Sequence, residues 1–198
     1  MLTDYIEKFS NQTFDIDVEG IEALGRIITV ATKTAIEKPN IIFTGVGKTS
    51  YVAGYAAALI SSVTNLRCFY LDTTEIAHGS AGAIQERDIV IFISNSGKTA
   101  EILRALEIVR TKGATTASIT KNDSNPLAKG VDYPIVASYP EEGGPWNLAP
   151  RLSINAQNTV IELLSIYLQI SMGFTKEEYQ KNHQAGSIGA ALSAELTK

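Results

Sequence analysis

Short runs rich in β-branched residues alternate with segments of helical length, and this alternation constrains the fold more than any other feature of the chain. The runs are each too short to form a buried helix, and they span residues 41–44, 68–71, 89–94, 116–120 and 133–136. The helical stretches between them span residues 50–62, 99–112 and 125–129. This order predicts a parallel sheet with right-handed crossovers and helices on both faces, which is a three-layer α/β/α sandwich.

The two ends of the chain have a helical character. The apolar residues between positions 21 and 31 fall on one helical face, and residues 140–150 form an irregular loop with two glycines and three prolines. A long apolar helix is expected over residues 152–172, and Thr175 and Glu178 have the spacing of a capping box. We therefore expect one domain over residues 1–198, with an N-terminal helical segment (1–38), an α/β core (39–138) and C-terminal helices (150–198).

Composition excludes several classes of protein. A chain of 198 residues with 44% hydrophobic residues can bury one substantial core, and its net charge of −4 argues against an extended nucleic-acid-binding surface. No apolar stretch approaches the ~18 residues of a membrane span. Cys68 is the one cysteine and lies in a predicted strand, so it indicates strand packing rather than a disulfide. We expect a cytoplasmic protein with no membrane and no nucleic-acid partner.

The segment FTGVGKTS follows the first predicted strand and has two candidate nucleotide-binding interpretations. A Walker A loop would need glycine where Ile42 stands, and a dinucleotide fingerprint would need glycine in place of Ser50. Both interpretations fail on these residues. What remains is either a strand-to-helix turn or an anion cradle, in which Gly45 and Gly47 allow backbone amides to approach an anion at a helix N-terminus.

A second loop repeats the pattern of buried strand, glycine turn and helix, with the sequence ISNSGKT. Its hydroxyl groups exceed what one helix cap requires, and Gly97 leaves room for amides to face a phosphate. This loop favours the anion cradle over the plain turn and suits a phosphate monoester. The predicted ligand-binding residues in the two loops are Gly45, Gly47, Lys48, Thr49, Ser94, Asn95, Ser96, Gly97 and Thr99.

The order of FTGVGKTS, EIAHGSAGAI, ISNSGKT, EEGGPWNLAP and GFTKEEYQKNHQAGSIGAAL resembles the sugar isomerase (SIS) domain of arabinose 5-phosphate isomerases of the KpsF/GutQ type. The resemblance spans roughly residues 41–192. It implies a five-stranded parallel sheet of flavodoxin-like topology, a sugar phosphate as ligand, and a homotetramer or homodimer with shared active sites. Many relatives continue into paired cystathionine-synthase-type modules, which do not follow here, so we expect no adenine-nucleotide regulation.

Aldose–ketose isomerisation moves a proton between adjacent carbons, so it needs a base, a proton donor for ring opening and a cation near the developing oxyanion. By resemblance, Glu142 is the candidate acid/base, with its neighbour Glu141 as a substitute. His183 is the candidate for ring opening or proton shuttling, and His78 lies in a second motif of the family. Lys48 is placed to stabilise the enediolate. We predict no metal and no organic cofactor.

The chain departs from the family pattern at four places. Lys98 replaces an acid in the second loop, Ser80 replaces an aspartate, Arg151 begins a changed segment after LAP, and Gln184 begins a changed pair after His183. The added positive charge suggests a more anionic ligand, such as a bisphosphate. Two alternatives stay open: a 6-phospho-3-hexuloisomerase, and a phosphosugar-binding module without catalysis.

Overall fold

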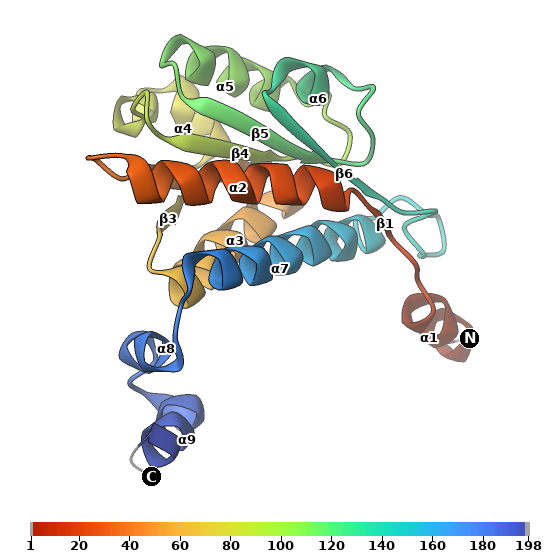
Figure 1. Cartoon of the computed structure of the whole chain (residues 1–198). Helices are drawn as coiled ribbons and strands as arrows, with labels where there is room; N and C mark the ends of the chain where they lie inside the picture. Colours follow the sequence, from red (N-terminus) through yellow and green to blue (C-terminus); the bar gives the residue numbers. More distant parts are fainter. Residues whose placement is uncertain (1, 197–198) are drawn as a thin grey trace.

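The computed structural model describes residues 2–196 (Figure 1). Within them the chain folds as an α/β/α sandwich around a six-stranded sheet in the order β1-β6-β5-β4-β2-β3. This confirms the predicted fold class. Positions 1, 197 and 198 of the expected domain lie outside the described residues. The strands are β1 (Asp15–Ile16), β2 (Asn40–Gly45), β3 (Arg67–Tyr70), β4 (Ile89–Ile93), β5 (Thr115–Thr120) and β6 (Tyr133–Ser138).

The strand count differs from the five expected, because β1 adds an edge strand antiparallel to β6. Its two residues pair with Ser138 and Ala137, and they lie inside the segment predicted to be helical. The other five strands are parallel, and among them the order is 2-1-3-4-5 when they are numbered along the chain. This is the flavodoxin-like order, with its topological switch point between β2 and β4.

Helices cover both faces of the sheet (Figure 1). The first face carries α2, α3 and α7, and the second carries α4, α5 and α6. The helices are α1 (Leu2–Ser10), α2 (Val18–Thr34), α3 (Lys48–Thr64), α4 (Thr73–Ala77), α5 (Ala100–Thr111), α6 (Pro126–Gly130), α7 (Leu152–Met172), α8 (Lys176–Asn182) and α9 (Gly186–Leu196), with a 3-10 turn at Ser80–Ala83.

The sheet is buried on both faces because its central strands are continuously apolar. Ile41 and Phe43 of β2 pack into the cluster under α2, α3 and α7, whereas Ile42 packs into the cluster under α4 and α5. Cys68 of β3 packs against the first cluster, and burial raises the pKa of its thiol to about 12. The thiol therefore stays protonated at neutral pH and serves packing, as its position in the sequence indicated.

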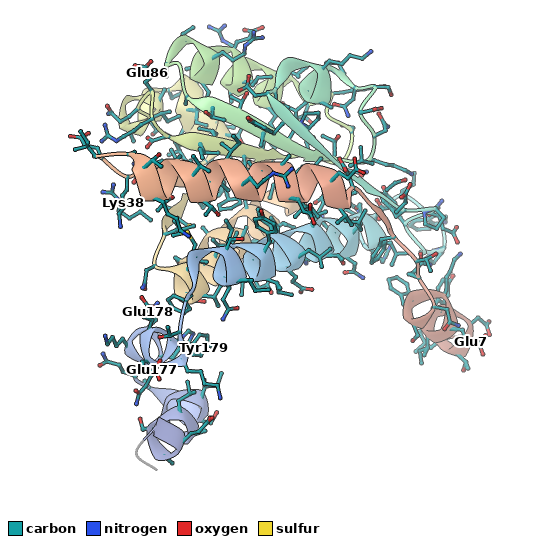
Figure 2. The ribbon with its side chains drawn as sticks, viewed as in Figure 1. Glu7, Lys38, Glu86, Glu177, Glu178 and Tyr179 are labelled. Carbon is teal, nitrogen blue, oxygen red and sulfur yellow. The ribbon has the colours of Figure 1, made fainter. Side chains whose placement is uncertain are left out.

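The terminal helices project from the sandwich. Figure 2 shows Glu7 on α1 at one end, and Glu178 and Tyr179 on α8 at the other. Helix α8 begins with the predicted capping box: the Glu178 amide donates to Thr175 Oγ1 at 3.2 Å, and the Thr175 amide donates to Glu178 Oε2 at 2.9 Å. Figure 1 shows α8 and α9 leading away from the sheet beyond the end of α7. Across residues 2–196, no helix is both long and apolar enough to span a bilayer.

Candidate functional site

The two glycine loops meet at one edge of the sheet. Strands β2 and β4 are parallel neighbours, with Gly45 opposite Ile93, so the loops that follow them leave the same carboxyl edge. Helix α3 then covers one face and α5 the other, so the loops diverge at the switch point, where parallel sheets bind ligands. Together they line a cavity of about 230 Å³, which we call the loop pocket. Its lining residues are Val46, Lys48, Thr49, Ser94, Asn95, Ser96, Thr99, Pro150 and Ser153.

The first loop brings the N-terminus of α3 to the loop pocket. Gly47 has φ +67° and no side chain caps the helix that starts at Lys48. A Cβ atom on Gly45 would lie 2.9 Å from backbone atoms of Thr49, so glycine lets the chain turn tightly into the helix. The Thr49 hydroxyl donates to Val46 O at 3.0 Å and holds this turn closed. The uncapped amides of a 17-residue helix make a favourable place for an anion.

The second loop is shaped by its own serine hydroxyls. Ser94 Oγ accepts from the Gly97 amide and Ser96 Oγ accepts from the Lys98 amide, each at 3.2 Å. Since a hydroxyl also carries one O–H donor, both serines can donate to a phosphate while they hold the loop. Gly97 has φ +61°, and a Cβ atom there would collide with the side chain of Asn125. The loop conformation therefore depends on glycine at this position.

Glu142 is buried at the N-terminus of α7, with 7% of its surface exposed. Its Oε2 accepts from the amides of Arg151 at 2.7 Å and Ser153 at 3.2 Å, and its Oε1 accepts from the Tyr139 hydroxyl at 2.7 Å. Burial acts to raise the pKa of this carboxyl, but hydrogen bonds from the Arg151 amide and the Tyr139 hydroxyl outweigh it, and the net pKa is lowered. Glu142 is therefore a carboxylate at neutral pH. Its neighbour Glu141 is half-buried and forms an ion pair with Lys8 of α1.

The structure adds two residues that sequence reasoning missed. Tyr139 directly follows β6, and its hydroxyl accepts from Asn95 Nδ2 at 2.8 Å. Ser153 is buried in the first turn of α7 and lines the loop pocket. The position of Tyr139 at the carboxyl end of the last strand was a signal that could have identified it, because the other site loops leave the same edge.

The four predicted catalytic residues are not gathered in one place within this chain. Lys48 lines the loop pocket, and Glu142 binds the amide of Ser153, which also lines it. His78 ends α4 and is exposed over a separate pocket of about 300 Å³ between α4 and α5. His183 follows α8, where its ring stacks on Tyr179 with 3.9 Å between centroids. Their catalytic roles stay predictions.

The departures from the family pattern also have defined places. Lys98 is exposed and is not among the residues that line the loop pocket. The Arg151 guanidinium lies against Gly144 and does not line it either. The loop between Tyr139 and α7 carries Trp146, which is 84% exposed. The suggested preference for a bisphosphate therefore has no support from the pocket lining and stays a prediction.

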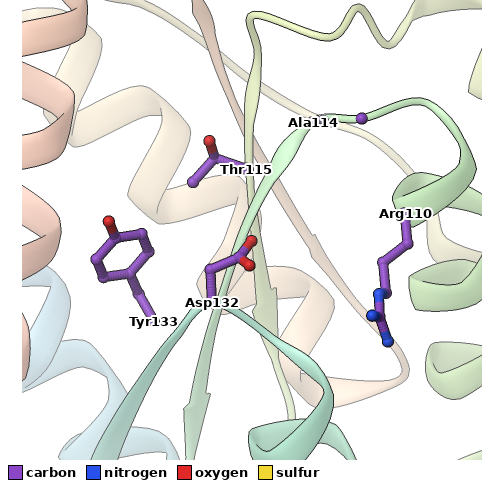
Figure 3. A pocket seen from close by; sticks show the side chains of 6 residues that line it. Arg110, Ala114, Thr115, Asp132 and Tyr133 are labelled. Carbon is purple, nitrogen blue, oxygen red and sulfur yellow. The ribbon is translucent and has the colours of Figure 1, made fainter.

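A further pocket, of about 420 Å³, lies at the opposite edge of the sheet (Figure 3). Arg110, Thr115, Asp132 and Tyr133 line it, where β5 and β6 begin. The Asp132 carboxylate accepts from the Thr116 amide at 2.8 Å and the Thr116 hydroxyl at 2.7 Å, so it holds the strands together. Ligands of parallel sheets bind at the other edge, which favours the loop pocket as the functional site. Within residues 2–196 no cluster of three or more His, Cys, Asp or Glu side chains is arranged to hold a metal ion.

Comparison with known proteins gives one consistent family. The SIS domain model matches residues 35–167. The chain is 36% identical to the arabinose 5-phosphate isomerase KdsD of Pseudomonas aeruginosa over 78% of this chain and 47% of that protein. It is 28% identical to KdsD of Yersinia pestis over 94% of this chain and 58% of that protein. The chain thus spans about half the length of the curated relatives it matches.

A solved structure agrees with this assignment. The Escherichia coli CFT073 protein c3406 in complex with arabinose 5-phosphate has a TM-score of 0.77 and 26% identity, over 91% of this chain and 90% of that one. Fold, loop geometry and sequence similarity converge: the chain belongs to the SIS domain family.

Proposed function

We propose that this protein is an aldose–ketose isomerase of sugar phosphates, and that it interconverts arabinose 5-phosphate and ribulose 5-phosphate. One observation carries the proposal: two glycine loops from neighbouring parallel strands line a single pocket with hydroxyl groups, a helix N-terminus and Lys48. The relatives named above act on a substrate of this class, which supports the choice of a pentose 5-phosphate.

The phosphate would occupy the second loop. Ser94, Ser96 and Thr99 line the pocket there, and Gly97 allows the tight turn in which the two serine hydroxyls are held. The start of α3 faces the same pocket and adds partial positive charge. With the phosphate held there, the carbon atoms of the sugar extend toward Pro150 and Ser153, beside the Glu142 carboxylate.

The proposed reaction balances without a cofactor. A base removes the proton from C2 of the open-chain aldose, and the electrons of the broken C–H bond form an enediolate. The same base returns a proton to C1, while the hydroxyl proton on O2 moves to O1 and the ketose forms. Glu142 is ionised, which is the form that a base requires, and the Lys48 ammonium would stabilise the enediolate oxygen. His183 or His78 would open the sugar ring, because imidazole accepts and donates protons near neutral pH.

We further propose a homodimer or homotetramer whose copies share active sites. His183 lies on the projecting α8–α9 segment, so a second copy is needed to bring such a histidine to a loop pocket. Helices α3 and α7 pack together and present an exposed apolar surface, the α3–α7 face, with a groove of about 290 Å³. Its apolar residues are Tyr51, Tyr55, Leu163, Ile166 and Ile170. An exposed apolar surface of this kind supports the proposal that this face is the interface between copies. The cytoplasmic location stays a prediction from the sequence.

The deciding experiment is hydrogen exchange at carbon. The purified protein is incubated in deuterium oxide with separate pentose and hexose phosphates, and deuterium at the carbon next to the carbonyl is measured by NMR. We expect exchange with arabinose 5-phosphate and its loss in Glu142→Gln. Glu141→Gln is the matched control, since it removes the neighbouring carboxylate, and it should keep the exchange.

Other outcomes would contradict the proposal. Exchange only with 3-hexulose 6-phosphates would indicate a 6-phospho-3-hexuloisomerase. Binding of the sugar phosphate without exchange would indicate a phosphosugar-binding module without catalysis. His78 does not line the loop pocket, and this favours the second alternative, because a sugar bound there would lack one predicted proton donor in the pocket lining.

A further inference from the structure

We propose that Tyr139 is a positioning residue that connects the phosphate-binding loop to the Glu142 carboxylate. The inference rests on the proposed function, and it extends that function to a residue for which the family motifs have no role. Tyr139 lies outside the glycine loops and is the first residue after β6. Its one hydroxyl group is hydrogen-bonded both to Asn95 of the second loop and to Glu142.

The connection is a short chain of hydrogen bonds. Asn95 lines the loop pocket and donates through Nδ2 to Tyr139 Oη at 2.8 Å. Tyr139 Oη donates to Glu142 Oε1 at 2.7 Å. Glu142 Oε2 then accepts from the amides of Arg151 and Ser153 at the start of α7. These hydrogen bonds therefore connect the second glycine loop to the start of α7, where Ser153 lines the same pocket.

The direction of each bond follows from the groups involved. A carboxylate only accepts hydrogen bonds, so the Tyr139 hydroxyl must be the donor to Glu142. Its lone pairs remain for the Asn95 amide. Burial, followed by the hydrogen bond to Glu142, raises the pKa of the phenol to about 12, so the hydroxyl keeps its proton throughout the neutral range. At neutral pH the hydrogen bonds therefore run in one direction only, from Asn95 to Tyr139 and from Tyr139 to Glu142.

The tyrosine ring is held as firmly as its hydroxyl. It is 6% exposed and belongs to the apolar cluster under α2, α3 and α7. Lys121 Nζ lies 4.2 Å from the ring centroid, and the Lys121 amide donates to Asn95 O at 3.1 Å. Phenylalanine would keep these ring contacts and lose only the hydroxyl. Tyr139→Phe therefore isolates the hydrogen-bond chain from the packing of the core.

The experiment measures the carboxyl of Glu142 and the reaction separately. In protein labelled with ¹³C-glutamate, the Glu142 signal is assigned by its disappearance in Glu142→Gln and titrated by NMR without substrate. In Tyr139→Phe we expect the titration midpoint to rise by about half to one pH unit, because the ionised form loses one hydrogen bond. The acid limb of the isomerase pH profile should move upward by the same amount, with kcat reduced roughly tenfold and KM changed by less than about twofold.

Two controls keep the result specific. Tyr133→Phe removes a hydroxyl from the first residue of the same strand, at the far edge of the sheet, and should change neither the titration nor the profile. Incorporation of 3-fluorotyrosine makes the phenol a stronger donor and should lower the Glu142 midpoint, the opposite direction from Tyr139→Phe. That decrease should vanish when the fluorinated protein carries Tyr139→Phe, which tests the link even if the variant is less stable.

Each outcome decides a different point. An unchanged Glu142 midpoint in Tyr139→Phe overturns the proposed link, whatever the activity of the wild type. A shifted midpoint with an unchanged acid limb and kcat overturns the positioning role. If the wild type exchanges no substrate hydrogen while the midpoint shifts, the proposed isomerase function has failed, and Tyr139 is left with a structural role only.

Discussion

Gly97 shows how a single residue without a side chain determines the shape of the site. Its φ of +61° is rarely adopted by other residues, and Asn125 occupies the space that a Cβ atom would need. Asn125 in turn donates to Thr120 Oγ1 at 3.0 Å and caps α6 by accepting from the Ala128 amide. A change at Gly97 therefore disturbs the turn and the packing behind it.

We predict that Gly97→Ala lowers the free energy of unfolding by about 2 kcal/mol or more, from backbone strain and the displaced asparagine. Binding of inorganic phosphate should weaken at least tenfold, since the turn would no longer hold the Ser94 and Ser96 hydroxyls in place. Urea unfolding and calorimetric titration check these values. Gly82→Ala is the control, because that position faces open space at an ordinary φ, and it should stay within about 0.5 kcal/mol of the wild type. Equal losses of stability and of phosphate affinity in the two variants would show that the conformation of Gly97 is not what shapes the site.

At the residue scale, the sequence predicted the glycines and hydroxyls of the two loops, because backbone needs and local spacing determine them. The same approach missed Tyr139, whose partners Asn95 and Glu142 come from distant parts of the chain or from an irregular loop. Such hydrogen bonds depend on how distant segments pack in the folded protein, so the periodic pattern of a single helix or strand does not reveal them.

At the element scale, α7 is stabilised by an acid that lies nine residues before its N-cap, Arg151. No side chain within its first turn caps it, and Glu142 accepts from two of its first amides instead. The pKa of Glu142 is lowered in the folded protein. Its contribution to stability is therefore fully present above the unfolded pKa, about 4.3, and is lost as the pH falls through the folded value.

We predict that Glu142→Gln lowers the free energy of unfolding by about 1–3 kcal/mol at pH 7, because the helix amides lose an ionised acceptor. The difference from the wild type should shrink as the pH falls below about 4. Chemical unfolding at several pH values gives the comparison. Glu141→Gln removes a half-buried ion pair with Lys8 and should cost about 1 kcal/mol or less at every pH. A difference that is constant with pH would show that the Glu142 charge does not stabilise α7.

Most elements follow from the sequence because each one buries a periodic apolar face. The prediction for α7 coincides with the structure at both ends, and the five parallel strands lie within two residues of their predicted bounds. Strand β1 was missed because two residues are too short to show an alternation. It forms because the edge of β6 is free to pair with it. That edge exists only once the sheet has assembled, so the local sequence does not predict the strand.

At the scale of the whole molecule, the α3–α7 face is the feature that one copy of the chain leaves unexplained. Ile166 is 52% exposed on α7, one helical turn after Glu162, which lines the groove between the two helices. We predict that Ile166→Lys converts the proposed oligomer to a smaller species, because burying an ammonium group in an apolar interface is costly. Light scattering coupled to size exclusion measures the mass. The control is Val30→Lys, a similar change at an exposed position of α2, which should leave the mass unchanged. An unchanged mass in Ile166→Lys would contradict the assignment of the α3–α7 face as the interface.

The parallel direction of the five core strands was predictable from alternation and right-handed crossovers, whereas their flavodoxin-like order was expected from the family resemblance. This order puts the loop pocket at the switch point between β2 and β4. The position of His183 was not predictable in the same way. Its motif occurs late in the chain, on helices that leave the sandwich. In the proposed oligomer, the site at which that histidine acts would depend on contacts between copies, which a single chain does not contain.

Trp146 gives the molecule an optical reporter. It is the one tryptophan of the chain, and it stands almost fully in water on the loop that joins Tyr139 to α7. Its emission should be red-shifted in the free protein, and any rearrangement of this loop over a bound sugar would change the wavelength or intensity. A change in emission on addition of a sugar phosphate would allow occupancy to be followed by fluorescence in real time, without a dye or a coupled assay.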